Sequence, residues 1–417
     1  MSSLRGVTIK EGRIGQNVAG DQREFGLLVE GVAVPGKIAL NEEHALMRVS
    51  DAEAIGIDAD YDTANNVVLY RHITEFYRMC GEGRKLHIML VGQGLTTDQI
   101  TDAAKSLAVY SKGMIADMAI ALNPAAVETT HVNGLPQTIY ELIPKTQAFA
   151  QWAWDNDMPL HVVLEGRNIT PNVAGLVNLR EFTMQVSGEN VALEACKVTL
   201  VVGQDYVYAE TLGNTGKLFS DVGNYLGVLA SQAWNRNPGE WETQNLTAAP
   251  LGKFMVGGLS NHKKYSEVYA DLETMNDKGY VFPIEYQGSA GYWWNDGHVC
   301  APVVMDAQGN MNQHTIYYSH TMNECKRSLR KAYLPEVKKP VELDENGKLP
   351  SSMIEYYNSI GNILFESLAS KGLISNGKST TDSESDLLIE KVLKVAFAVI
   401  PTGCVNEIIG TINLKAK

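Results

Sequence analysis

Short apolar strands alternate with helices through the first half of the chain, and this alternation limits the possible fold more than any other feature. Apolar runs of strand length lie within residues 23–34, 85–91, 116–124, 160–169 and 197–205, and helical apolar spacing is found within residues 64–80, 96–111 and 138–159. This order is typical of a parallel or mixed sheet covered by helices. The sequence therefore predicts an α/β (α+β mixed) fold in which mixed sheets are flanked by helices.

The length of the chain indicates more than one hydrophobic core. A chain of 417 residues usually forms two or three domains. Residues 1–20 have few apolar side chains between their glycines, which predicts an extended N-terminal arm. A polar, proline-bearing stretch at 235–252 has the composition of a boundary, so we expect one α/β domain at 21–250 and a second at 251–417.

The charge balance excludes some classes of partner. The chain has 48 acidic and 35 basic residues, and its formal net charge is −13. A nucleic acid partner is not expected, because neutralising phosphates requires a basic face. No apolar run reaches the roughly 20 residues that cross a bilayer, and the N-terminus lacks the apolar segment of a secretory signal. We therefore expect a cytoplasmic protein without a membrane span.

The nine histidines and five cysteines form no pattern that indicates catalysis or metal binding. The histidines make no H-E-x-x-H or H-x-H motif, and the cysteines make no C-x-x-C pair. An odd number of scattered cysteines favours reduced, inert thiols over a disulfide framework. We expect no catalytic residue, no metal and no cofactor.

One glycine-containing turn supports an alternative function. In the stretch LVGQGLTTDQ, Gly92 and Gly94 follow a predicted strand and precede a predicted helix, as in a nucleotide-binding site. Thr97 stands where the third glycine of that motif would be, and no Lys-Ser/Thr pair follows. A tight turn whose helix is capped by Thr97 or Asp98 is favoured, and an α/β enzyme or nucleotide-binding protein is the alternative.

A basic helix stands out in this acidic chain. Within CKRSLRKAYLPEVKK the cations are Lys326, Arg327, Arg330, Lys331, Lys338 and Lys339, and Glu336 is the only acid. Lys326 and Arg330 are four residues apart, as are Arg327 and Lys331, so on a helix these like charges repel. Either water solvates this face or an acidic surface lies against it.

The chain ends in a segment with the pattern of a strand. In VNEIIGTINLKAK, Ile408, Ile412 and Leu414 fall on one side of a two-residue period, and polar residues such as Thr411 and Asn413 fall on the other. A C-terminal β-strand must pair to satisfy its backbone. It either folds back on residues 391–400 as a hairpin or pairs with another molecule.

The order of these pieces resembles that of contractile tail sheath proteins. The matching stretches are RGVTIKEG and FGLLVEGVAVPGK near the start, then VLYRHITEFYRMCGEGRKLHIMLV, DLETMNDKGYVFPIEYQGSAGYWWNDGHV, IYYSHTMNECKRSLRKAYLPEV, MIEYYNSIGNILFESLASKGLISNGK and the two terminal strands. The resemblance covers residues 5–110 and 215–417, and residues 111–214 correspond to a variable outer part. Trp293 and Trp294 stand where the family often has Trp-Gly before an Ala/Arg-Thr element, so the chain resembles a divergent member.

The resemblance implies a structural protein of a phage or prophage tail, or of an injection device derived from one. Sheath subunits give their terminal segments to sheets of neighbouring copies and build a helical tube, so the implied contacts between subunits are Val7, Ile9, Ile408, Ile412 and Leu414. The implied contacts with the inner tail tube protein are Lys326, Arg327, Arg330 and Lys331. Baseplate or tail-terminator proteins are further implied partners. Such a protein is cytoplasmic during assembly and then part of the virion tail or injection-device sheath.

Overall fold

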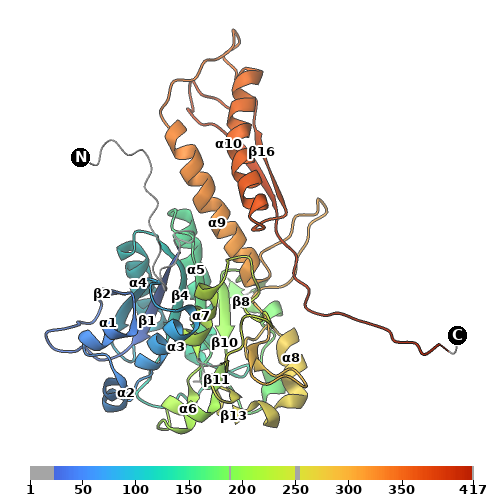
Figure 1. Cartoon of the computed structure of the whole chain (residues 1–417). Coiled ribbons are helices and arrows are strands. Elements are labelled where there is room, and N and C mark those ends of the chain that lie inside the picture. The colour runs from blue at the N-terminus through green and yellow to red at the C-terminus, as the bar shows by residue number, and fades with distance from the viewer. Residues whose placement is uncertain (1–22, 187–188, 249–253, 416–417) are drawn as a thin grey trace, which may run out of the picture.

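The computed structural model describes residues 23–186, 189–248 and 254–415, and its fold is built on a six-stranded sheet (Figure 1). In spatial order the strands are β10 (Val198–Val201), β7 (His161–Glu165), β4 (Ile115–Ala121), β1 (Glu24–Glu30), β3 (Leu86–Val91) and β2 (Glu43–Leu46). Neighbouring strands are parallel except β2, which is antiparallel to β3. Because both faces of the parallel strands are buried, the strands are continuous apolar runs in the sequence.

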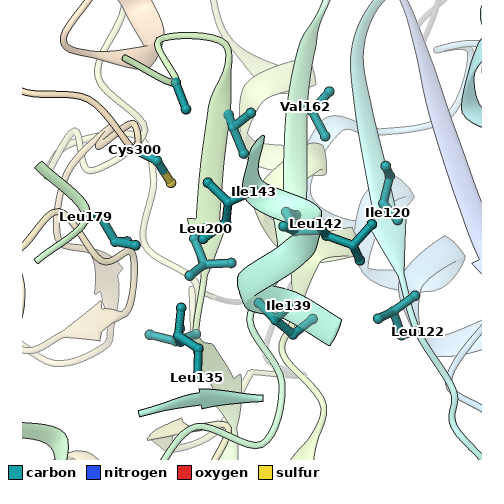
Figure 2. Packing of buried hydrophobic residues seen from close by; sticks show 14 of the residues in the cluster. Ile120, Leu122, Leu135, Ile139, Leu142, Ile143, Val162, Leu179, Leu200 and Cys300 are labelled. Carbon is teal, nitrogen blue, oxygen red and sulfur yellow. The ribbon is translucent and has the colours of Figure 1, made fainter. Parts of the chain in front are cut away.

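Helices cover both faces of this sheet. One face is covered by α1 (Val49–Ala54), α2 (Ala59–Asn65), α3 (Tyr70–Cys80) and α7 (Val222–Ser231), and the other by α4 (Thr97–Tyr110) and α5 (Gln137–Asp155). Figure 2 shows Ile139 and Leu142 of α5 in one buried cluster with Ile120 and Val162 of the sheet. The expected α/β fold is confirmed.

Shorter elements extend the fold around this body. They are β5 (His131–Val132), β6 (Leu135–Pro136), β8 (Thr183–Val186), β9 (Glu189–Ala192), β11 (Gly203–Asp205), α6 (Tyr206–Glu210), β12 (Gly257–Leu259), β13 (Lys263–Lys264), α8 (Leu272–Asp277), β14 (Pro283–Ile284) and β15 (Trp293–Trp294). The 3₁₀ turns are η1 (Val173–Gly175), η2 (Leu179–Glu181), η3 (Gly216–Leu218), η4 (Tyr265–Glu267), η5 (Tyr269–Asp271) and η6 (Leu334–Glu336). The last elements are α9 (Ile316–Tyr333), α10 (Ser351–Ser370), β16 (Asn376–Thr381) and β17 (Val395–Ile400).

The hydrophobic core is continuous across the boundary expected at position 250. Each of the two large clusters of buried side chains combines residues from 25–246 with residues from 254–317. Residues 111–214, expected as a variable outer part, supply β4, β7 and β10 of the central sheet. A third, smaller core around Cys325 and Phe365 also includes Trp234, which lies before the expected boundary. How the chain divides into domains, and whether residues 111–214 vary among relatives, stay predictions.

Helix ends match the sequence in one case and differ in another. The helix expected before Gly81 is α3, and Gly81 has a φ of +78°, a backbone conformation that favours glycine. The cap of α4 is neither Thr97 nor Asp98. The Thr96 hydroxyl oxygen accepts the backbone N–H of Gln99, and the Gln99 side-chain oxygen accepts the backbone N–H of Thr96, so the two residues form a capping box.

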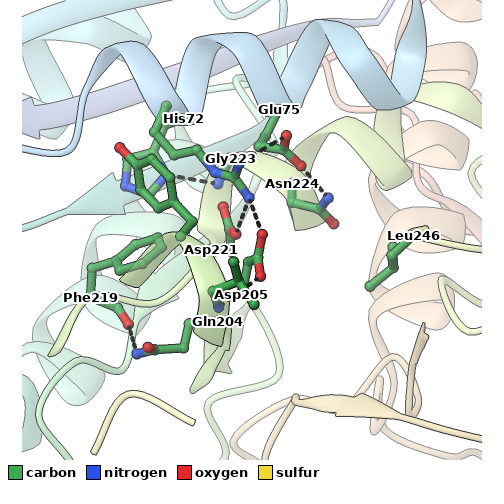
Figure 3. A network of polar contacts seen from close by, with 12 residues as sticks. His72, Glu75, Gln204, Asp205, Phe219, Asp221, Gly223, Asn224 and Leu246 are labelled. Atoms are coloured by element: carbon green, nitrogen blue, oxygen red, sulfur yellow. Dashed lines mark hydrogen bonds and ion pairs between the residues drawn. The ribbon is translucent and has the colours of Figure 1, made fainter. Parts of the chain in front are cut away.

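A buried charge network joins α3 to α7 (Figure 3). The Arg71 guanidinium lies 3.0 Å from Asp221, 3.3 Å from Glu75 and 3.5 Å from Asp205. Burial alone raises the pKa of Glu75, but Arg71 and Arg78 outweigh it and hold this pKa below its ordinary value. The helices meet closely because α7 has glycine at Gly223, where a Cβ would lie 2.4 Å from the backbone of His72.

Asp62 caps α3 from the neighbouring helix. One carboxylate oxygen accepts the backbone N–H groups of Leu69 and Tyr70, at 3.0 and 2.9 Å, and the other accepts that of Arg71 at 3.1 Å. Burial raises the pKa of Asp62 to about 6 despite these hydrogen bonds. A raised carboxyl pKa contributes stability that is complete below the unfolded pKa and is lost as the pH rises through about 6.

Replacing Asp62 with Asn should remove this pH dependence. The free energy of unfolding of the wild type relative to Asp62→Asn is expected to fall by about 1 kcal/mol between about pH 5 and about pH 8. Urea unfolding at both pH values measures this difference. Asp60→Asn, an exposed change on the same helix, is the control and should show no such trend. A difference that stays constant or grows with pH contradicts this role.

Candidate assembly interface

The last quarter of the chain forms a module that stands away from the six-stranded sheet (Figure 1). This C-terminal module, residues 325–400, comprises the second half of α9 with α10, β16 and β17. Its core contains Cys325, Phe365, Leu368 and Ile374. The orientation of the module depends on how α9, which belongs to both parts, is held, and on two residues of the body: Trp234 packs in the module core and Asn235 donates to Gly372 O at 2.9 Å.

One edge of the two-stranded sheet in this module is closed by α10. The backbone N–H of Ser379 in β16 donates to the Asn362 side chain at 2.8 Å, and that of Thr381 donates to Asn358 at 2.6 Å. Both asparagines lie on α10, one helical turn apart. Side chains therefore occupy the backbone positions that another strand would need on this edge.

The other edge of the sheet is open. Among the described residues β17 pairs with β16 alone, from Asn376 opposite Ile400 to Thr381 opposite Val395. The strand has the apolar sequence VAFAVI, and Phe397 is 39% exposed. Proteins usually shorten, charge or cover such an edge. An apolar strand with an open edge is therefore a site where a further strand can pair.

A groove of about 1360 Å³ lies between β17 and α9. Its lining is mainly apolar and includes Trp154, Leu329 and Tyr333 on one side, and Val395, Phe397 and Val399 of β17 on the other. Lys326, Arg330, Lys338, Lys339 and Lys391 are among its charged lining residues. A strand added to the open edge of β17 would have its inward side chains in this groove.

The chain after β17 leaves the module as an exposed segment, residues 401–415, which we call the connector. Its start is held by the body: Asn235 donates to Thr402 at 3.1 Å, and Asn406 donates to Asp296 at 2.7 Å. The rest is fully exposed. The relative solvent exposures of Ile408, Ile412 and Leu414 are 88%, 94% and 101% of the value for a fully accessible residue.

The expectation of a strand at the C-terminus is therefore wrong for the single chain. Residues 401–415 have no strand conformation, and the fold-back hairpin on residues 391–400 is not formed. The physical reason is pairing: β16 already occupies one edge of β17, and the contacts at Asn235 and Asp296 lead the connector away from the other edge. Val7 and Ile9 lie outside the described residues, so their expected contacts stay predictions.

The basic helix is α9, and part of its charge is neutralised within the chain. The Lys326 ammonium lies 3.5 Å from Asp157 and 4.5 Å from the centre of the Trp154 ring. Arg327 donates to the backbone oxygens of Gly113 and Ile115, at 2.5 and 2.7 Å. It also donates to Pro159 O, so its guanidinium contacts two segments of the body, one at the start of β4 and one just before β7.

The other two cations of this helix are more exposed. Arg330 is half exposed and lies 3.4 Å from Asp157, and Lys331 is exposed. Asp157 and backbone oxygens of the same chain thus relieve part of the repulsion between these charges. Nothing in the sequence indicated that these groups lie beside α9. The expected tube contact of all four cations stays a prediction, and Arg330 and Lys331 are the two that a partner can reach most easily.

The turn at Gly92 and Gly94 is closed by the chain itself. Glu30, the last residue of β1, accepts the backbone N–H of Gly94 at 3.1 Å and that of Asn123 at 2.8 Å. This is the edge of the sheet where α/β proteins bind ligands, at the carboxyl ends of neighbouring parallel strands. The adjoining cavity, about 100 Å³, is smaller than the several hundred Å³ of ordinary ligand pockets. A carboxylate also occupies N–H groups that a phosphate would use.

Within the described residues, no helix is both long and apolar enough to span a bilayer. The same residues contain no cluster of three or more histidine, cysteine, aspartate or glutamate side chains that could hold a metal ion.

The sequence did not predict the asparagines that close the edge of β16, nor the aspartate that lies beside the cations of α9. Asn358 and Asn362 have the helical spacing of four residues, but nothing near them in the sequence shows that a strand lies alongside. Asp157 follows the helix that ends at Asp155 and gives no local signal that it faces α9. A cation-rich helix together with an acid just after another helix is the kind of pair that would have suggested the contact.

Three solved structures that the chain resembles come from contractile particles. The chain is similar to a chain of the contracted helical sheath of the anti-feeding prophage, with a TM-score of 0.56, 11% identity and 99% of both chains covered. It is also similar to a chain of the baseplate of the same particle, with a TM-score of 0.57, 11% identity and 100% of both chains covered. It is similar as well to a chain of the contracted sheath complex of the extracellular contractile injection system PVC, with a TM-score of 0.56 and 10% identity. That match covers 100% of this chain and 99% of the other.

These matches confirm the expected fold: the chain has the fold of a contractile tail sheath protein. At the level of sequence, the family model described as DUF2586, N-terminal domain, matches residues 6–298. The chain belongs to this DUF2586 family. No curated protein matches its sequence. The C-terminal module and the connector lie beyond the part that the family model covers.

Proposed function

We propose that the protein is a structural subunit of a contractile phage-tail-like sheath that polymerises helically around a tail tube by exchange of terminal strands. The observation that carries this proposal is the unequal pair of edges in the C-terminal module. Asn358 and Asn362 close the outer edge of β16, while β17 has an apolar, open edge beside a groove. The sheath fold supports the same function.

The connector has the alternating apolar and polar residues of a strand that could pair with the open edge of β17. Its even-numbered apolar residues Ile408, Ile412 and Leu414 would enter the groove, and the polar side chains of Thr411 and Asn413 would face solvent. Main-chain hydrogen bonds along β17 give such an added strand its affinity, and side chains in the groove give it its register. Because the connector of one copy fits a site on the next, the contact is heterologous and builds an open helix.

The proposed partners follow from this role. Copies of the same chain bind one another through the connector, and the N-terminal residues Val7 and Ile9 are proposed for a second such contact. A tail tube protein with an acidic surface is the proposed partner of α9, where Arg330 and Lys331 remain exposed. Baseplate or tail-terminator proteins would bind the ends of the tube. The protein would be cytoplasmic during assembly and then part of a virion tail or injection device.

Electron microscopy and sedimentation of the purified chain, alone and co-expressed with candidate tail tube proteins, test this function. We expect regular tubes with helical order when the tube protein is present. Nucleotides should not raise the melting temperature, because ligand that binds only the native state must stabilise it and the Gly92–Gly94 turn is closed. Particles that stay monomeric with every candidate tube protein contradict the proposal.

A further inference from the structure

A hairpin that none of the expectations included protrudes from the body just before α9. Residues 303–311, the 303–311 hairpin, lie between Pro302 and Asn312 and have Met305 bridged to Met311. Four apolar side chains on it are exposed: Val303 by 63%, Val304 by 40%, Met305 by 73% and Met311 by 41%. Isolated exposed apolar residues are normal, but here four lie within nine residues, and the bridge places Met305 opposite Met311.

Polar groups fix the shape of this hairpin. The Asp306 carboxylate accepts the backbone N–H groups of Gln308 and Asn310, at 2.9 and 2.7 Å, and the Asn310 side chain donates to its other oxygen at 2.7 Å. Gly309 has a φ of +83°, which the tight turn requires. Asn312 donates from its side chain to Pro302 O at 2.8 Å. A hairpin shaped in this way is ordered before it binds, which lowers the entropy cost of docking.

The 303–311 hairpin leaves the body beside the connector. His298 and Thr315, which flank the hairpin, are joined by an antiparallel bridge, and Asn406 of the connector is bonded to Asp296, two residues before it. In Figure 1 the loop before α9 and the C-terminal segment leave the same side of the molecule. A molecule that captures the connector is therefore brought close to the hairpin.

We infer that the 303–311 hairpin is a second docking element, which packs its apolar side chains on the same neighbouring copy that accepts the connector. The inference rests on the proposed function, because it takes that neighbour to be a second copy of this chain. After Asn406 the connector has no contact with the body among the described hydrogen bonds and ion pairs, so on its own it does not fix the angle between copies. A rigid apolar hairpin next to it sets that angle, and it does so without adding a strand.

The test compares Met305→Asp with Ala307→Asp in the full-length chain. Both positions are exposed on the hairpin, but Ala307 lies in its polar turn. A charge buried at the centre of an apolar contact is costly, so Met305→Asp should raise the protein concentration needed for assembly by about tenfold or more. Ala307→Asp should leave that concentration unchanged. Both variants should melt at the wild-type temperature, because neither residue is buried in the single chain.

A peptide with the sequence of residues 405–417 separates this inference from the proposed function. Its fluorescence anisotropy is measured with a chain that lacks those residues, with and without Met305→Asp. We expect equal binding to both chains, since the hairpin does not form the strand site. Equal peptide binding with wild-type assembly of Met305→Asp would overturn the inference alone. Absent peptide binding would overturn strand exchange, and a defect confined to tube attachment would assign the hairpin to the tube protein instead.

Discussion

Removing residues 405–417 should convert the protein from a polymer-forming subunit into a folded monomer. The deleted residues that the structure describes contribute to no core cluster of the single chain. Their one hydrogen bond to the body is from Asn406 to the Asp296 carboxylate, so the free energy of unfolding should fall by no more than about 3 kcal/mol. The main-chain and side-chain contacts that the connector makes with the next copy would be lost. Sedimentation velocity and electron microscopy measure assembly, and urea unfolding measures stability. Tubes formed by the truncated chain would contradict strand exchange.

Single substitutions in the connector give a matched control for this deletion. Ile412 lies on the side that is expected to enter the groove, whereas Ile409 lies on the opposite side of the same two-residue period. Both isoleucines are almost fully exposed in the single chain, by 94% and 85%. Ile412→Asn should therefore prevent assembly at concentrations where Ile409→Asn still assembles. Equal effects of the two substitutions would show that the segment does not bind as a strand.

Replacing Arg327 with Met should release the C-terminal module from its fixed orientation. Arg327 donates hydrogen bonds to carbonyl groups at Gly113, Ile115 and Pro159, and Met keeps the packing of the stem while these bonds are lost. Hydrogen bonds from charged groups contribute more than neutral ones, so the free energy of unfolding should fall by about 2–4 kcal/mol. Small-angle X-ray scattering should also show a broader range of shapes. Urea unfolding measures the stability.

Two further variants isolate the role of the Arg327 guanidinium. Arg327→Lys keeps the charge, but one ammonium cannot match the planar fork that contacts several carbonyls, so it should restore only part of the stability. Lys331→Met changes an exposed cation on the same helix and should change the free energy of unfolding by less than about 0.5 kcal/mol. An Arg327→Met protein with wild-type stability and scattering would show that the Arg327 guanidinium does not hold the module in place.

Local patterns were sufficient to predict most of the body. The expected strand of KLHIMLV is β3, and the helix that precedes it ends at Gly81, because periodicity and a C-terminal glycine act within a few residues. The order of helices and strands then indicated an α/β fold. These signals do not depend on what lies elsewhere in the chain, which is why they could be interpreted from the sequence alone.

Long-range contacts explain what the sequence could not show. Glu30 closes the turn at Gly94 from 64 residues away, and Arg327 finds its acceptor at Gly113 from 214 residues away. The connector differs for another reason. Its period predicts a strand, but a strand needs a partner edge, and the contacts at Asn235 and Asp296 lead the connector away from the open edge of β17 in the same copy. The two-residue period of the connector therefore predicts pairing with another copy, and this pairing is absent from a single copy.

The most direct measurement of strand exchange is a disulfide between two differently labelled copies. In a Cys404→Ser background, one population has Ala398→Cys on the exposed face of β17 and the other has a cysteine at Ile409, Thr411 or Asn413, which the period places on the same face of the combined sheet. Cross-strand neighbours are close enough for a disulfide. We predict that one of the three pairs forms covalent dimers when the two populations assemble together, and that neither population does so alone. Assembly without any cross-link from the connector to β17 would contradict the account.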